Sequence, residues 1–273
     1  MLLSFDSGVS ALEQFQVGLN TIANNIANVN TTGFKSSTVD FADTLSQTLG
    51  ANAAGSEQVG NGVTTSAITT DFSSGSFSAT GGASDLGIEG NGFFLVKDPT
   101  TGVTYATRDG QFTKDSNGYL LTSNGMRLQG FTAANGTTVG DIQLDNTGAT
   151  NPAATVSSFN INGTTGIITV NLSDNEQIQR AQVALQSFTY PSQLQKAGGN
   201  LYTNLAAAGP LATPTAPSVS GPGTLLVGQL EMSNVDLASE LTSLITTQRA
   251  YEANSKVITT SDEILQSLVN LKR

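Results

Sequence analysis

The chain has 273 residues, a formal net charge of −10 and only 12% charged side chains, about half the share found in an ordinary soluble protein. It contains no His and no Cys, which excludes Ser-His and Cys-His nucleophiles, the usual zinc sites and a disulfide framework. Its Lys and Arg residues are scattered singly, so we expect no nucleic-acid partner.

An amphipathic helix is predicted at the N-terminus, over residues 1–31. From Leu12 onward its apolar residues alternate between steps of three and four, which is the seam spacing of a coiled coil. The seam residues are Leu12, Phe15, Leu19, Ile22, Ile26 and Val29. The other positions carry mostly Gln, Asn and Thr, so we expect this helix to face other protein or a confined space rather than bulk water.

The first residues show no sign of a targeting segment. No Lys or Arg precedes Lys35, and the apolar residues 1–3 are too short for the core of a cleaved signal peptide. No apolar run approaches the ~18 residues of a membrane span. We therefore expect no membrane span and, if the chain leaves the cell, export without a cleaved signal.

The middle of the chain predicts an antiparallel β domain. Residues 32–70 are rich in Ser, Thr, Ala, Asn and Gly without firm periodicity, and we interpret them as an extended linker or arm. Over residues 71–227, short β-suited runs alternate with hairpin dipeptides such as Asp109-Gly110, Asn117-Gly118 and Asn124-Gly125. Clustered prolines mark a second irregular connection at residues 208–226.

Residues 228–273 predict a C-terminal helix, running from about Asp236 to Leu271. A heptad row of apolar residues begins at Leu230, and a second, mixed row accompanies it. The candidate contact residues are Leu237, Leu241, Leu244, Tyr251, Ile258 and Leu265. Gln248 and Arg249 are candidates for fixing the register between helices, because a polar group on a coiled-coil seam specifies alignment.

The predicted fold class is therefore α+β. Long N- and C-terminal helices are expected to pack as a coiled-coil core domain, with the β domain inserted between them. The two apolar stripes either cover only each other or also pair with neighbouring copies of the chain, and the sequence leaves both arrangements open. We take the twelve seam residues as a candidate self-assembly interface.

Enzyme chemistry is not expected. The carboxylate pairs Asp85 with Glu89 and Asp109 with Asp115 could in principle support glycoside hydrolysis, but turns favour Asp for geometric reasons. The glycines around Gly90 do not match a dinucleotide-binding fingerprint, because an apolar strand pattern follows where a helix should. We therefore expect no catalytic residue, no cofactor and no metal site.

Several stretches resemble bacterial flagellar rod and hook proteins. The N-terminal stretch is Ile22-Ala-Asn-Asn-Ile-Ala-Asn-Val-Asn-Thr-Thr-Gly-Phe-Lys35. Similar stretches are Tyr105-Ala-Thr-Arg-Asp-Gly-Gln-Phe112 and Asn124-Gly-Met-Arg-Leu-Gln-Gly130 in the middle and Gly228-Gln-Leu-Glu-Met-Ser-Asn-Val-Asp-Leu near the C-terminus. The resemblance covers essentially the whole chain. It does not separate a hook protein from a distal-rod protein.

The resemblance implies a structural subunit that polymerises helically into the hook or distal rod, transmits torque and encloses the export channel. It also implies export through the flagellar type III apparatus, location in the flagellum, and neighbours among the rod, hook, junction and cap proteins. In this family the terminal helices form the inner tube and the β domain lies outside it. The alternative is a secreted β-rich adhesin or carbohydrate-binding module with helical arms.

Overall fold

A computed structural model describes residues 2–52, 55–134, 136–210, 213–218 and 221–271. The chain divides into two compact units, and it passes from one to the other after residues 29, 35, 71 and 234. The helical unit comprises residues 1–29, 36–71 and 235–273, and the β unit comprises residues 30–35 and 72–234. The fold is α+β, and its paired strands are antiparallel throughout the described residues.

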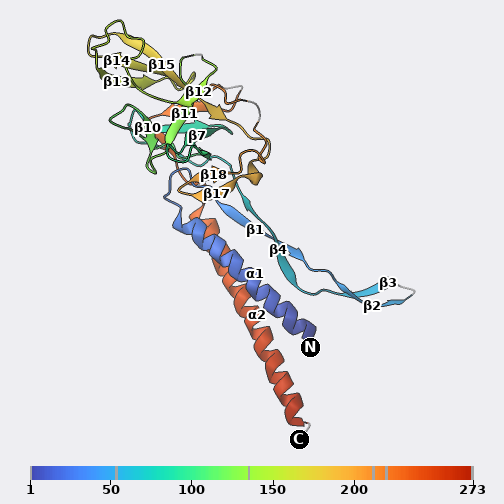
Figure 1. The fold of residues 1–273 in the computed structure, drawn as a ribbon. Helices are drawn as coiled ribbons and strands as arrows, with labels where there is room; N and C mark the ends of the chain where they lie inside the picture. The colour runs from blue at the N-terminus through green and yellow to red at the C-terminus, as the bar shows by residue number, and fades with distance from the viewer. Residues whose placement is uncertain (1, 53–54, 135, 211–212, 219–220, 272–273) are drawn as a thin grey trace. The chain divides into compact units, whose positions relative to one another are not determined.

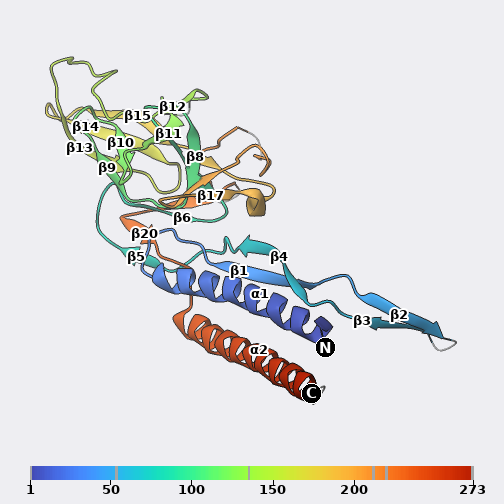
Figure 2. The same ribbon diagram turned by 60° about the horizontal axis from the view of Figure 1, so that its bottom comes forward.

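The helical unit contains two helices and a long ribbon of strands (Figures 1 and 2). Its elements are α1 (Leu2–Ala27), β1 (Ser37–Asp43), β2 (Gln47–Asn52), β3 (Gly55–Val59), β4 (Val63–Thr70) and α2 (Leu237–Leu271). α1 and α2 lie side by side and run in opposite directions in both views. The β1–β4 ribbon lies against α1, where Phe15 and Phe41 meet edge to face with ring centroids 6.2 Å apart.

Residues 32–70 form more regular structure than their sequence indicated. β1 pairs with β4 from Ser37 opposite Thr70 to Asp43 opposite Val63, and β2 pairs with β3 further along the same arm. The strand pattern is weak because the ribbon leaves large apolar residues, among them Ile68, exposed to solvent. The alternation of buried and exposed positions that marks an ordinary half-buried strand is therefore missing.

The start of the C-terminal segment differs from the prediction. Residues 229–231 form strand β20, which pairs with β5 in the β unit, whereas the helix itself spans Leu237–Leu271, close to the expected start at about Asp236. Leu230, the first member of the heptad row, is thus a buried strand residue of the β unit and not part of the helical seam. The spacing of seven continued past the helix by coincidence, because an isolated apolar strand residue can match a helical row.

The β unit is built around one large antiparallel sheet, whose strands follow the order β13-β14-β15-β11-β7-β8-β18-β17 with shorter strands attached. The strands of the whole β unit, in chain order, are β5 (Phe77–Ala79), β6 (Leu86–Glu89), β7 (Phe93–Lys97), β8 (Thr104–Thr107), β9 (Phe112–Lys114), β10 (Leu120–Thr122), β11 (Arg127–Phe131), β12 (Val139–Asp141), β13 (Val156–Ile161), β14 (Ile167–Leu172), β15 (Gln177–Val183), β16 (Leu185–Gln186), β17 (Gln195–Gly198), β18 (Leu201–Thr203), β19 (Thr224–Val227) and β20 (Gln229–Glu231). A 3-10 turn lies at Pro191–Gln193. Its main core gathers fully buried aliphatic residues and Phe94, which meets Phe112 edge to face at 5.2 Å.

The predictions made from the hairpin dipeptides are confirmed at two positions and wrong at a third. Gly118 and Gly125 take positive φ angles of 84° and 78° in the turns that join β9 to β10 and β10 to β11, which confirms both predictions. Asp109-Gly110 is not a hairpin turn. A Cβ on Gly110 would lie 1.6 Å from the carbonyl oxygen of Leu86, so this glycine permits a close approach of two backbone segments.

Candidate assembly interface

The predicted seam of α1 is half-buried along its whole length. The six predicted residues Leu12, Phe15, Leu19, Ile22, Ile26 and Val29 are neither fully buried nor fully exposed. Because α1 ends at Ala27, Val29 lies in the turn that follows the helix. The helices approach closely where Gly8 faces α2, because a Cβ there would lie 3.2 Å from Cγ1 of Ile258. The helical unit by itself therefore covers only part of this stripe.

The predicted contact residues of α2 divide into two groups. Leu244 and Ile258 are half-buried, whereas Leu237, Leu241, Tyr251 and Leu265 are exposed. Gln248 and Arg249 are also exposed. The structure therefore shows neither of these two polar residues holding α2 against α1 within the chain.

Asn25 is a buried residue, only 1% exposed, that connects three elements of the helical unit, namely α1, β1 and α2. Its Nδ2 donates to the carbonyl oxygen of Ser37 at 2.8 Å and to Oε1 of Glu240 at 3.0 Å. Its Oδ1 accepts from the backbone N–H of Ser37 at 3.0 Å. These bonds fix α1 against β1 and α2 at one point along the helix, because a buried amide left unpaired is costly.

Sequence reasoning missed Asn25 as a contact residue. Its spacing from Ile22, Ile26 and Val29 places it within the apolar stripe of α1. A polar residue inside such a stripe is a signal for a buried hydrogen bond. Its partners could not be deduced, because Glu240 lies 215 residues away in sequence.

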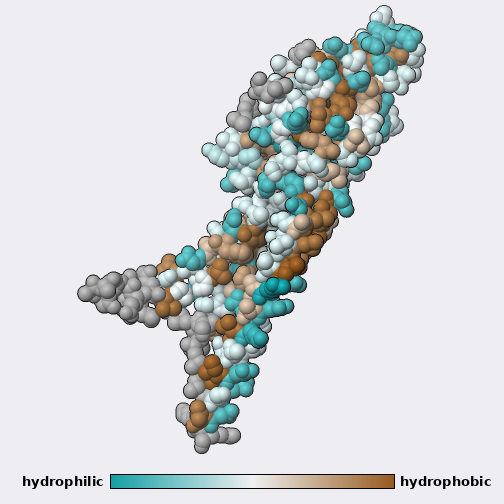
Figure 3. Space-filling model, turned by 180° about the vertical axis from the view of Figure 1, so that it is seen from behind, coloured by the Kyte–Doolittle hydropathy of each residue, from teal (hydrophilic) through white to brown (hydrophobic). Residues whose placement is uncertain are grey.

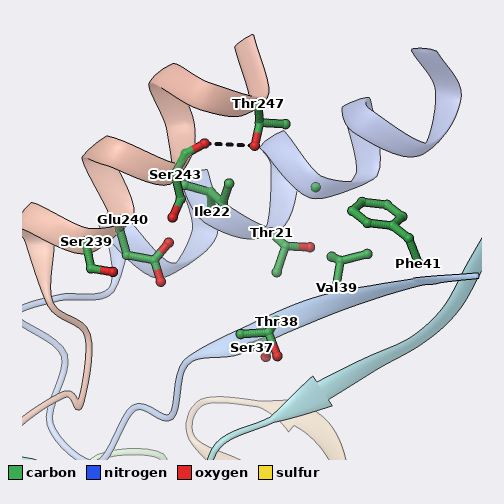
Figure 4. Close-up of a pocket in the computed structure, with 11 residues that line it drawn as sticks. Thr21, Ile22, Ser37, Thr38, Val39, Phe41, Ser239, Glu240, Ser243 and Thr247 are labelled. Atoms are coloured by element: carbon green, nitrogen blue, oxygen red, sulfur yellow. Dashed lines mark hydrogen bonds between the residues drawn. The ribbon is translucent and has the colours of Figure 1, made fainter. Parts of the chain in front are cut away.

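A groove of about 300 Å³ opens between α1, β1 and α2, next to the Asn25 contact (Figure 4). The apolar side chains Ile22, Val39 and Phe41 and a set of Ser and Thr hydroxyls surround it, and Glu240 places a carboxylate at its edge. Gly18 of α1 also lines it. A Cβ added at Gly18 would lie 3.6 Å from Cζ of Phe41 and 3.8 Å from Cγ2 of Thr247, which are ordinary contacts.

A continuous apolar stripe covers the first half of α2 (Figure 3). We call Leu237, Leu241 and Ile245 the ridge; they are 44%, 49% and 48% exposed and follow one another every four residues. Burying one such side chain contributes ~1.5 to 3 kcal/mol. Three in a row are a large apolar surface for one helix to leave in water.

The β unit contains a separate feature, a cluster of three buried ions. Nζ of Lys35 lies 2.7 Å from Oε1 of Glu231, and Nη1 of Arg108 lies 3.4 Å from Oε2 of the same carboxylate. All three side chains are at most 1% exposed. We call these residues the charge cluster.

The surroundings of the charge cluster satisfy most of its polar atoms. Lys35 also donates to the carbonyl oxygen of Ser73, and Arg108 donates to that of Gly90. Burial lowers the pKa of Arg108 below its usual value, and burial raises the pKa of the neighbouring Tyr202. One carboxylate thus faces two basic side chains in the cluster.

Residues 30–35 reach the charge cluster as an inserted segment of the β unit. The N–H of Gly33 donates to the carbonyl oxygen of Glu231 at 2.8 Å, and Asn200 donates to that of Thr32. Gly33 takes a φ of 66°, and a Cβ there would lie 2.7 Å from backbone atoms of Arg108. Only glycine fits this position without strain.

Within the described residues, no group of His, Cys, Asp or Glu side chains could hold a metal ion. Among the described residues, no helix has the length and apolar character needed to cross a membrane. Asp109 accepts hydrogen bonds from the Thr32 hydroxyl and the backbone N–H of Gln111, and Asp115 accepts from the backbone N–H of Ser116 in its own turn.

Comparison with known proteins matches most of the chain. Three family models match it, namely "Flagella basal body rod protein" at residues 5–35, "Flagellar hook protein FlgE/F/G D1 domain" at residues 87–170 and "Flagellar basal body rod FlgEFG protein C-terminal" at residues 226–271. The flagellar basal-body rod protein FlgG of Bacillus subtilis (strain 168) is 41% identical over 281 aligned residues, which cover 100% of both chains. The chain belongs to the flagellar rod and hook protein family.

Membership of the flagellar rod and hook family makes this chain a structural protein of the flagellum and not an enzyme. FlgG of Borreliella burgdorferi is 35% identical with 100% of both chains covered. The flagellar hook protein FlgE of the same organism is 42% identical over 142 residues, which are 49% of this chain and 32% of that protein. The adhesin alternative has no support.

Each of the three segments matched by a family model contributes one residue to the charge cluster. Lys35 lies in the first matched segment, Arg108 in the second and Glu231 in the third. The stretches that carry the family resemblance therefore meet at one buried ionic site in the β unit. Sequence reasoning identified the stretches but not their meeting point, because Lys35 and Glu231 are 196 residues apart.

Proposed function

We propose that this chain is a rod-type subunit of the flagellar axis and that copies of it polymerise through the helical unit. The observation that carries the proposal is the exposed apolar surface of α2 together with full-length similarity to FlgG proteins. Similarity to the FlgE hook protein extends over only 32% of that protein. A rod assignment therefore accounts for the whole chain, and a hook assignment does not.

In this proposal the terminal helices form a coiled-coil core, and the β domain lies outside it. Its supports are the alternating seam of α1, the antiparallel contact of the two helices, and the exposed ridge. The core would carry torque and surround the channel. Residues 30–35 and 228–234, which connect the two units in sequence, each contribute a residue to the charge cluster of the β unit.

The partners of the polymer follow from the same proposal. They are further copies of this chain, the neighbouring axial proteins of the flagellum, and the type III export apparatus that would deliver the chain unfolded. Copies joined by two different surfaces form an open helical polymer, whereas a surface that pairs with itself closes into a dimer. The proposed core needs the first kind of contact.

The seam assignment is tested by Leu19→Asp and Ile26→Asp in the full chain. We expect each variant to stay monomeric under conditions in which the unchanged chain forms tubes, while near-ultraviolet circular dichroism of the β unit is preserved. Tubes formed by either variant would refute the assignment of the α1 seam. Electron microscopy of the unchanged polymer tests the rod assignment, for which we expect straight tubes; curved tubes would favour the hook.

A further inference from the structure

We propose that the ridge of one copy docks into the α1–β1–α2 groove of the next copy, so that each subunit presents a donor and an acceptor surface on the same helix. This inference rests on the proposed polymer and adds which surfaces meet. The ridge consists of Leu237, Leu241 and Ile245, and the groove is the cavity at Gly18 and Glu240. The occupant is therefore a second copy of this chain.

The two surfaces lie on different sides of α2. The groove receives Glu240, Ser243 and Thr247 from this helix. At about 100° per residue, these positions and the ridge positions lie on faces roughly 130° apart. One copy can therefore fill the groove of a second while its own groove is filled by a third. Such a contact is heterologous, which is the kind of contact that an open filament requires.

The chemistry of the two surfaces is complementary. The ridge is a row of residues spaced by four, and such rows pack into the grooves between neighbouring helices. Arg249 continues the row at the same spacing and is exposed, whereas Glu240 places a carboxylate at the edge of the groove. Apolar surface thus faces Ile22, Val39 and Phe41, and the cation at the end of the ridge faces an anion.

Gly18 provides a way to block the groove without disturbing the subunit. Its Cβ position lies at ordinary contact distance from Phe41 and Thr247, so an alanine fits within the chain. The same methyl group occupies space that the ridge of the next copy needs. Gly18→Ala should leave the monomer at least as stable, because alanine is favoured over glycine inside a helix, yet it should weaken assembly.

The test uses full-length variants and complementation. Gly18→Leu blocks the groove and keeps the ridge; Ile245→Asp breaks the ridge and keeps the groove. We expect each variant alone to be monomeric by analytical ultracentrifugation, and an equimolar mixture to form a 1:1 complex that does not grow further. We expect Gly18→Ala to raise the critical concentration for polymerisation about tenfold. Val103→Asp, at a residue that is 45% exposed in the β unit, is the control and should polymerise like the unchanged chain.

Three outcomes overturn the docking model: polymers of Gly18→Leu at the unchanged critical concentration, polymers of Ile245→Asp alone, or a mixture that stays monomeric although both variants keep their helix content. If Gly18→Leu fails to fold, Gly18→Ala replaces it at a concentration below its own raised critical concentration, where it is monomeric by itself and should still pair with Ile245→Asp. Failure of the unchanged chain to polymerise would count against the proposed function itself, which separates the two results.

Discussion

The charge cluster allows a sharp prediction about stability. Replacing Glu231 with alanine removes the carboxylate that pairs with both Lys35 and Arg108, and both cations are buried. Breaking a buried ion pair from one side costs about 3 to 5 kcal/mol, because a charge is left without compensation. Here one substitution takes the same carboxylate away from two buried cations and also removes the acceptor of the Gly75 N–H. We therefore expect a loss at the upper end of that range.

The assay is urea unfolding of the full chain under conditions that keep it monomeric. Near-ultraviolet circular dichroism reports mainly on the β unit, which holds all tyrosines except Tyr251. With a slope of about 2 kcal/mol per molar urea, a loss of about 5 kcal/mol lowers the midpoint by about 2.5 M. The matched control is Asp141→Ala, which breaks the half-exposed pair with Arg127 at 2.9 Å. Such pairs contribute about 1 kcal/mol or less.

The result that refutes this reasoning is a Glu231→Ala midpoint no lower than that of Asp141→Ala. Two further variants separate charge from packing. Glu231→Gln keeps the size of the side chain and should still destabilise strongly. Lys35→Met combined with Glu231→Leu should not restore stability, because Arg108 stays buried without its carboxylate.

Three more outcomes follow from the contacts. Burial raises the pKa of Asp109, so this carboxyl holds its proton more tightly in the folded chain than in the unfolded chain. The contribution of Asp109 to the free energy of unfolding is therefore present at low pH and is lost as the pH rises. Asp109→Asn, which keeps both acceptor contacts, should therefore raise the urea midpoint at pH 7 but not below the carboxyl's unfolded pKa. Asn25→Leu should destabilise the helical unit by about 1 to 3 kcal/mol and Glu240→Gln much less, as measured by thermal melts of helicity. Gly33→Ala should cost at least about 1 kcal/mol in the same urea assay, since its φ is 66°.

The sequence alone determined the broad organisation of this protein. A seam with steps of three and four has few alternatives to an amphipathic helix, and α1 and α2 are found where that pattern placed them. Asn-Gly dipeptides at residues 117 and 124 fixed two turns, because these residues tolerate the required backbone angles. Both features depend on residues close together in the chain, and local geometry is what sequence patterns encode.

The tertiary structure decided which distant groups meet. Leu230 matched the helical row but forms a strand with β5, and residues 36–70 became a paired ribbon despite their weak pattern. Asn25 donates a hydrogen bond to Glu240, and Lys35 donates one to Glu231, and in each case the two residues are separated by more than half of the chain. The sequence around a single Asn or Lys does not identify its partner, because the side chain becomes buried and paired only when distant segments pack together and exclude water. The ridge and the groove are likewise visible only after packing shows which apolar residues the chain leaves exposed.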